Sequence, residues 1–246
     1  MFVSKRCFIL KTCGSTTLLN AVQPLLYIVQ ELTGFNEVLD IFYSRKNFMR
    51  PELQNKPHTS FEDEVEVLDS LFQDGAAYCM GRINHDCWYL YTLNTPLGYR
   101  GFQVADQTLE VIMQDLDQKV MRIFTQEGAS SARDATQKSG IDQLYPMATL
   151  DEYLFTPCGY SVNGILKGGY YFTIHITPEP DYSYVSFETN APQPEALFVS
   201  SRNESAPINA GVSSSRSVQM LQRLLFLASH VASVPAECAL HSRCPN

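Results

Sequence analysis

Two side chains stand at positions in the sequence where ordinary residue chemistry could make them reactive. Cys13 follows a predicted strand over residues 2–12 and precedes a predicted helix, and a helix N-terminus lowers the pKa of a thiol. It could donate a proton or act as a nucleophile, although a small buried apolar residue is the alternative. His175 lies between Ile174 and Ile176 of a predicted strand, so the period of two places it on the opposite face. It is either an acid–base group or a hydrogen-bonded core histidine.

A serine and a glutamate lie in predicted turns near the ends of strands. Residues 158–161 follow a strand pattern, and Gly159 allows a tight turn that could aim Ser161 inward. This run is not the G-x-S-x-G elbow of hydrolases, because Asn163 stands where the second glycine is required. Glu179 lies just past the end of the next strand, where ligand contacts are common. The alternative for Glu179 is a solvated carboxylate in a turn.

Acidic residues recur within strand patterns in the second half of the chain. Asp106, Thr108 and Glu110 alternate and therefore share one face of a strand, and Glu188 lies in another strand pattern. Inward carboxylates are costly unless they meet a cation, which a buried cationic ligand or Lys11 could supply. From the residues alone, an outward and solvated face is the favoured interpretation.

No arrangement of residues predicts a metal or phosphate site. Cys238, His241 and Cys244 are spaced like ligands, but no second pair at zinc spacing accompanies them. The sequence has no glycine-rich phosphate loop and no dinucleotide-binding fingerprint. We therefore expect no metal.

Composition excludes several classes of protein. Hydrophobic residues make up 45% and charged residues 18% of the 246 residues, which is enough for a core. A net charge of −8 argues against a nucleic-acid or membrane-surface binder. No apolar run approaches the roughly 18 residues of a membrane span, and no targeting segment is recognisable. Seven cysteines without framework spacing indicate reduced thiols and a cytosolic protein.

Hydrophobic periodicity predicts many strands and a few separate helices. The apolar helix pattern after residues 15–17 ends at Gly34, Pro24 marks a kink or a late start, and Ser60 with Asp63 forms a capping pattern. A short helix is expected over 117–124. Strand patterns cover residues 2–12, 41–43, 76–80, 88–93, 107–113, 150–155, 169–177 and 182–189. These elements predict an α+β sandwich of sheets and helices.

The composition changes after Asn190. Residues 191–217 are rich in serine and proline and indicate a linker. Residues 218–246 form a separate tail, in which 218–232 could make one amphipathic helix. We therefore expect a folded core over residues 1–190.

Several long blocks, in one order, resemble the eukaryotic S-adenosylmethionine decarboxylases, and the animal enzymes in particular. The longest runs from Tyr171 to Asn190 and contains Thr173-Ile174-His175-Ile176. The other blocks are residues 2–5, 8–14, 42–49, 75–82, 86–93 and 157–161. The resemblance covers roughly residues 1–190. It implies a four-layer α/β/β/α sandwich of two antiparallel sheets with outer helices, incomplete here at both ends.

The resemblance implies a decarboxylase of spermidine and spermine synthesis that uses a pyruvoyl cofactor. This group is made by self-cleavage at a Glu-Ser bond and forms a Schiff base with the substrate. Cys13 matches the cysteine that reprotonates the α-carbon, and Ser161 and His175 match the pair that assists self-cleavage. Phe155 matches the aromatic residue that stacks on adenine, and Glu179 matches the carboxylate that holds the ribose hydroxyls.

The resemblance also implies partners. Lys11, Asp106, Thr108, Glu110 and Glu188 match the acidic region where putrescine activates the animal enzymes, which reverses the solvated interpretation of these carboxylates. The family further implies S-adenosylmethionine as substrate, a homodimer, and an N-terminal β-chain segment as a partner of the processed enzyme.

The resemblance places the serine that becomes the pyruvoyl group two residues before Met1. We therefore expect the 246 residues to contain no pyruvoyl precursor and to be inactive by themselves, because no amino-acid side chain supplies an electrophilic ketone. The tail after residue 200 matches nothing in the family. The alternative function is a non-catalytic isoform or partner of a full-length decarboxylase.

Overall fold

The computed structural model describes residues 1–82, 86–93, 108–192, 232–234 and 239–242. The chain divides into two units, Met1–Ala105 with Ala236–Asn246, and Asp106–Pro235. The expected core over residues 1–190 therefore contains parts of both units. Each unit combines antiparallel sheets with helices, so the predicted α+β class is confirmed.

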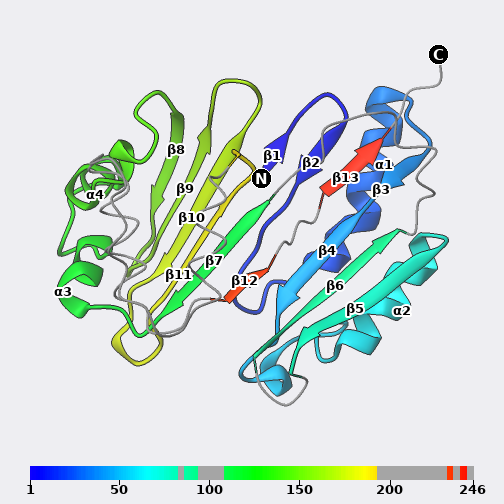
Figure 1. Cartoon of the computed structure of the whole chain (residues 1–246), viewed down its shortest axis with the longest axis horizontal. Coiled ribbons are helices and arrows are strands. Elements are labelled where there is room, and N and C mark those ends of the chain that lie inside the picture. Colours follow the sequence, from blue (N-terminus) through cyan, green and yellow to red (C-terminus); the bar gives the residue numbers. More distant parts are fainter. Residues whose placement is uncertain (83–85, 94–107, 193–231, 235–238, 243–246) are drawn as a thin grey trace. The chain divides into compact units, whose positions relative to one another are not determined.

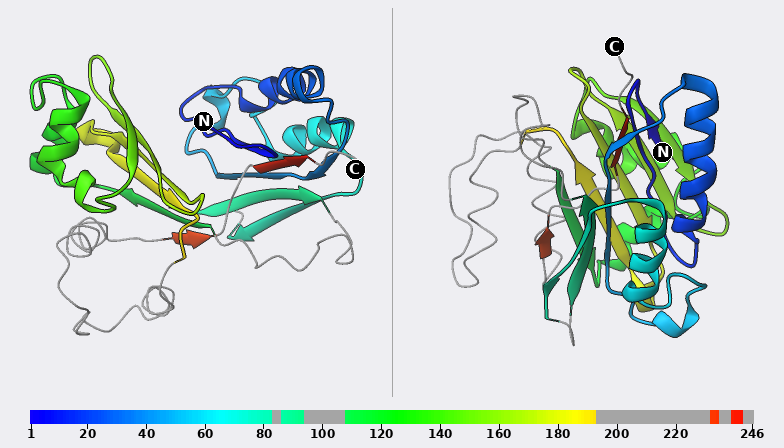
Figure 2. Two further views of the ribbon diagram at one scale, coloured as in Figure 1. Left: turned by 90° about the horizontal axis from the view of Figure 1, so that it is seen from above. Right: turned by 90° about the vertical axis from the view of Figure 1, so that its right-hand side faces the viewer.

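The first unit contains two antiparallel sheets. One has the order β1-β2-β13-β3, formed by Phe2–Val3, Cys7–Ile9, Ala239–Ser242 and Val38–Asp40. The other has the order β4-β6-β5, formed by Phe42–Lys46, Cys87–Leu93 and Gly75–Gly81. Helices α1 (Val22–Thr33) and α2 (Phe61–Leu71) lie on one side of these strands (Figure 2). Two short 3-10 helices, η1 (Leu18–Ala21) and η2 (Pro51–Leu53), lie in the connections.

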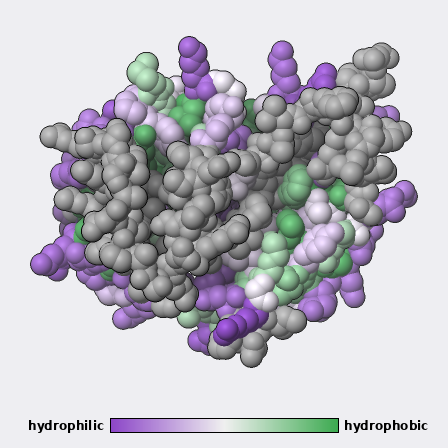
Figure 3. Space-filling model, viewed as in Figure 1, coloured by the Kyte–Doolittle hydropathy of each residue, from purple (hydrophilic) through white to green (hydrophobic). Residues whose placement is uncertain are grey.

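The core of the first unit lies between its helices and strands. Leu19, Val22 and Leu68 contribute from the helices, and Tyr43 and Tyr91 from β4 and β6. The other face of the three-stranded sheet is also rich in apolar side chains, which gather over these strands in Figure 3. The helices thus cover only one of two apolar faces.

The second unit is a six-stranded antiparallel sheet with the order β12-β7-β11-β10-β9-β8 (Figure 1). Its strands are Ala232–Val234, Leu109–Gln114, Tyr184–Thr189, Tyr171–Thr177, Tyr160–Ile165 and Thr149–Leu154. Helices α3 (Gln118–Met121) and α4 (Ala132–Ser139), with the 3-10 helices η3 (Arg122–Phe124) and η4 (Ile141–Gln143), pack on one face. The short η5 (Pro180–Tyr182) connects β10 to β11.

Alternation along β9 and β10 divides the sheet of the second unit into an apolar and a polar face. Val162, Phe172, Ile174 and Ile176 belong to the core under the helices. A Cβ atom on Gly164 would lie 2.1 Å from the ring of Phe172, so only glycine lets this ring lie against β9. The residues between them point to the other face, which carries the polar side chains.

Helix boundaries in the first unit partly agree with the sequence. α1 begins at Val22, so Pro24 lies in the first turn, where its missing N–H has no partner to lose. The predicted late start and the stop at Gly34, which has φ +73°, are confirmed. Leu32 belongs to the apolar pattern of this helix but is 80% exposed, whereas Leu19 and Val22 are buried.

Several expected elements differ. The predicted strand 2–12 is a hairpin of β1 and β2, since Ser4 N donates to Cys7 O at 2.8 Å and reverses the chain. β9 and α4 were not predicted. The apolar periodicity of α4 is weak. Its N-cap Ser131 and its C-terminal Gly140 are nevertheless residue types that signal the two ends of a helix in the sequence. Of the possible helix 218–232, residues 218–231 lie outside the described part and Ala232 begins β12.

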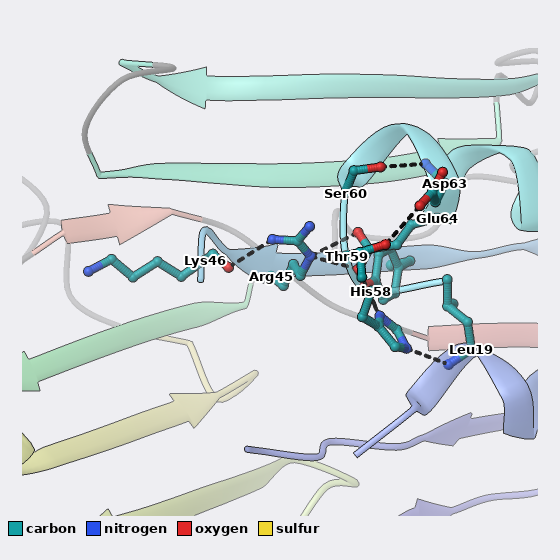
Figure 4. Close-up of polar contacts among 9 residues, drawn as sticks. Leu19, Arg45, Lys46, His58, Thr59, Ser60, Asp63 and Glu64 are labelled. Carbon is teal, nitrogen blue, oxygen red and sulfur yellow. Dashed lines mark hydrogen bonds and ion pairs between the residues drawn. The ribbon is translucent and has the colours of Figure 1, made fainter. Parts of the chain in front are cut away.

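Glu64 is the centre of a buried polar network in the first unit (Figure 4). Both of its carboxylate oxygens accept from Arg45 Nε at 2.8 Å, and Oε1 lies 2.7 Å from His58 Nδ1. His58 Nε2 accepts from Leu19 N at 3.3 Å. A backbone amide only donates, so Nδ1 carries the proton that neutral His58 gives to Glu64. The network therefore connects β4, α2 and η1.

We expect Glu64→Gln to lower the free energy of unfolding by about 3 kcal/mol, because it leaves Arg45 as a largely buried charge without its counter-charge. The single tryptophan, Trp88, lies in the same unit, so its fluorescence in a urea titration reports the change. Glu62→Gln, on an exposed position of the same helix, is the matched control and should change stability by less than about 0.5 kcal/mol. Equal effects of the two variants would contradict the prediction.

Candidate active site

Ser161 and His175 form a direct hydrogen bond on the polar face of the six-stranded sheet. They are opposite each other in the register of β9 and β10, and Ser161 Oγ lies 2.8 Å from His175 Nδ1. Ile174 and Ile176 belong to the core on the other face, as their alternation with His175 predicted. Ser161 lies within a strand and not in a turn, so the pairing of β9 with β10 sets its direction. The pair is suited to proton transfer between a hydroxyl and an imidazole.

The other nitrogen of His175 contacts a second pair of side chains on the same two strands. Thr173 Oγ1 lies 3.1 Å from His175 Nε2 and donates to Asn163 Oδ1 at 2.9 Å. Thr173 is opposite Asn163 in the register, one row of the sheet from Ser161 and His175. Sequence reasoning missed Thr173 and Asn163. The signal was the polar alternation Thr173-x-His175 and Ser161-x-Asn163, which a predicted β9 would have brought together.

Two glutamates lie side by side in the next strands of this row. Glu188 of β11 is opposite both Thr173 and Glu110 of β7. Glu110 is 5% and Glu188 4% exposed, and the Tyr171 hydroxyl donates to Glu188 Oε1 at 2.9 Å. The solvated outward face that the residues alone favoured is therefore wrong.

The remaining acidic-region positions are only partly described. Thr108 immediately precedes β7. Asp106 lies outside the described residues. Lys11 belongs to the first unit and is half-buried.

Phe155 follows β8 and presents its ring at the surface, 43% exposed. Its backbone is held twice, because Phe155 N donates to Gly159 O at 2.8 Å and Gln126 Nε2 donates to Phe155 O at 3.0 Å. Tyr153 meets the ring edge-on, with centroids 4.7 Å apart. Gly159 has φ +106°, a conformation that favours glycine, and closes this loop. The backbone contacts fix the position of Phe155 while its ring stays accessible for stacking.

Glu179 is the N-cap residue of η5, just past the end of β10, and its side chain makes no capping hydrogen bond. Its Oε2 is buried and has no hydrogen-bond partner among the described residues. Burial first and the nearby Glu179 carboxylate second raise the pKa of the Cys158 thiol. A buried acceptor that lacks a donor is suited to the hydroxyl groups of a ligand.

Cys13 is exposed and lies between β2 and η1 in the first unit. The expectation that it lies at a helix N-terminus is wrong, because η1 begins only at Leu18 and is a four-residue 3-10 helix. Thr17 makes no side-chain cap to η1. Among the described cysteines, Cys13, Cys79, Cys87 and Cys158 are free thiols.

The described residues contain no cluster of three or more histidine, cysteine, aspartate or glutamate side chains arranged to hold a metal ion. None of their helices has both the length and the apolar character needed to cross a membrane.

Comparisons with known proteins point to one family. A family model described as adenosylmethionine decarboxylase matches residues 1–209. The S-adenosylmethionine decarboxylase proenzyme of Xenopus laevis is 57% identical over 190 residues, and the match covers 77% of this chain and 56% of the relative. The proenzyme of Drosophila melanogaster is 52% identical over 200 residues, covering 77% and 57%. The chain thus spans a little over half the length of these relatives.

A solved structure agrees with this. The Trypanosoma brucei AdoMetDC-delta26 monomer has a TM-score of 0.57 and 25% sequence identity, and the match covers 91% of this chain and 74% of that one.

The raised pKa of Cys158 makes a testable prediction. The raised pKa of Cys158 keeps its thiolate fraction low at pH 8, so iodoacetamide should label it slowly. Glu179→Gln removes the negative charge that raises this pKa, and labelling of Cys158 at pH 8 should become a few-fold faster. Peptide mass spectrometry measures the rate at each cysteine, with exposed Cys13 of the other unit as the internal reference. An unchanged rate at Cys158 would count against the effect of Glu179 on this pKa.

Proposed function

The chain belongs to the adenosylmethionine decarboxylase family, and we propose that it supplies the acid–base and substrate-binding residues of an enzyme that decarboxylates S-adenosylmethionine for polyamine synthesis. The observation that carries the proposal is the 2.8 Å hydrogen bond between Ser161 and His175. These are two of the positions at which the chain resembles the catalytic residues of the family.

The cofactor that the family implies is a pyruvoyl group, whose ketone acts as the electron sink when the carboxylate leaves. The residues present fit such a group, because a hydroxyl and an imidazole in direct contact can move the protons that its formation requires. In this proposal His175 Nδ1 accepts a proton, and the hydrogen bond with Ser161 Oγ holds the imidazole in position. Cys13 would return a proton to the α-carbon of the product.

Two features support a nucleoside-bearing substrate. The accessible ring of Phe155 can stack on adenine, a contact that contributes about 1–3 kcal/mol to binding. The buried Oε2 of Glu179 can accept from the ribose hydroxyls. We propose these roles for Phe155 and Glu179, as the resemblance implies.

The paired carboxylates support a diamine activator. Glu110 and Glu188, directly opposite each other and buried, concentrate negative charge at one place on the sheet. A putrescine dication offers two ammonium groups for such a site. The resemblance also implies Lys11, Asp106 and Thr108 as putrescine-site residues.

The proposed setting follows from the same resemblance and from the free thiols. We propose a cytosolic protein that acts as a homodimer together with the β-chain segment of the processed family. A non-catalytic partner of a full-length decarboxylase is the alternative.

We expect the protein isolated from its own cells to release labelled carbon dioxide from carboxyl-labelled S-adenosylmethionine. Its intact mass should reveal a pyruvoyl end group in the same sample. The 246-residue polypeptide made by itself should release none, because no amino-acid side chain supplies the required ketone. Absence of release by the isolated protein would contradict the proposed activity and favour the non-catalytic alternative. Release by the 246-residue polypeptide alone would contradict its expected inactivity.

Putrescine should raise the melting temperature of the chain. At about a hundredfold excess over Kd the stabilisation is about 2.7 kcal/mol, which corresponds to several degrees for a domain of this size. Glu188→Gln keeps an oxygen for the Tyr171 hydroxyl but removes one charge, so most of the shift should disappear. Glu127→Gln, at an exposed position of the same unit, should keep the full shift. An undiminished shift in the Glu188 variant would argue against this site.

A further inference from the structure

Four side chains on β9 and β10 form one continuous hydrogen-bond chain. Ser161 Oγ contacts His175 Nδ1 at 2.8 Å, and His175 Nε2 contacts Thr173 Oγ1 at 3.1 Å. Thr173 Oγ1 in turn contacts Asn163 Oδ1 at 2.9 Å. The strand register places Ser161 opposite His175 and Asn163 opposite Thr173, so the backbone ladder holds all four side chains on one face.

Counting protons along this chain gives each contact a direction. Asn163 Oδ1 is a carbonyl oxygen and only accepts, so the single hydroxyl proton of Thr173 is given to it. Thr173 Oγ1 can then only accept from His175 Nε2, which must carry the ring proton. Neutral imidazole has one N–H, so Nδ1 is unprotonated and accepts from the Ser161 hydroxyl.

Burial and side-chain stiffness keep Thr173 in this role. Thr173 is 2% exposed, so water does not compete for its hydroxyl. Its branched Cβ restricts χ1, and its strand is paired on both sides, with β9 and β11. The hydroxyl position is therefore set by the backbone.

We propose that Thr173 and Asn163 are positioning residues that hold neutral His175 in the Nε2–H tautomer, so that Nδ1 faces Ser161 as the proton acceptor. Neither residue has to touch the substrate, because both act through the histidine. The use of this acceptor in catalysis rests on the proposed function. The tautomer does not depend on that function, since it follows from contacts within this chain.

The tautomer can be measured on the 246-residue chain by NMR with 15N-labelled histidine. His175→Gln identifies the signals of His175 among the five histidines. At a pH where the ring is neutral, we expect a protonated Nε2 and an unprotonated Nδ1. A protonated Nδ1 in the unaltered chain would overturn the proposal.

Variants separate positioning from mere packing. Thr173→Val keeps the shape but removes the acceptor, so a large part of the population should move to the Nδ1–H form. Thr173→Ser restores the hydroxyl and should restore the original tautomer. Asn163→Leu frees the Thr173 proton to be given to Nε2, which should also favour the Nδ1–H form. Backbone amide spectra verify that each variant is folded.

Thr177→Val is the matched control, because Thr177 lies on the same strand and face, two residues beyond His175. It should leave the ring signals of His175 unchanged. A folded Thr173→Val variant with unchanged tautomer would overturn the proposal. No substrate or cofactor enters the NMR measurement, so its result does not depend on the proposed decarboxylase activity. Failure of the tautomer proposal can therefore be distinguished from failure of the proposed function.

Discussion

The antiparallel pairing of β9 with β10 is the constraint on which the candidate site depends. The pairing places His175 opposite Ser161 and Thr173 opposite Asn163, while Ile174 and Ile176 fill the core on the other side. A slip by one residue would exchange the two faces, burying the imidazole among apolar side chains and exposing the isoleucines. The packing of helices on the apolar face therefore also holds the polar face in register. The same packing that stabilises the sheet positions the residues of the candidate site.

The polar face is organised by alternate residues of β10. Tyr171 donates to Glu188 of β11, Thr173 donates to Asn163 of β9, and His175 contacts Ser161 of β9. Each alternate side chain of this central strand thus connects to a neighbouring strand. Buried polar groups are tolerated when they are satisfied in this way. The acidic row with Glu188 lies beside the row with His175, so charge bound at one row is close to the acid–base pair at the other.

The first unit uses a similar arrangement away from the candidate site. Glu64 holds Arg45 and His58, and His58 holds the backbone of η1. In both units the hydrogen-bond partners of a histidine indicate which ring nitrogen carries the proton. For His58 the partners are a carboxylate and a backbone amide, which favour the Nδ1–H form. For His175 the partners are two hydroxyls, and the amide carbonyl of Asn163 that takes the Thr173 proton favours the Nε2–H form.

The sequence by itself determined the α+β class, the family, most strands, the cap at Ser60 and the face on which His175 lies. These follow from local periodicity, from capping chemistry and from residue order, all of which can be identified in short segments of the sequence. Only the tertiary structure decided that β9 is a strand, that Glu110 and Glu188 are buried together, and that Thr173 and Asn163 complete the chain from Ser161. Register between strands distant in sequence is set by packing of the whole sheet, and no local pattern encodes it.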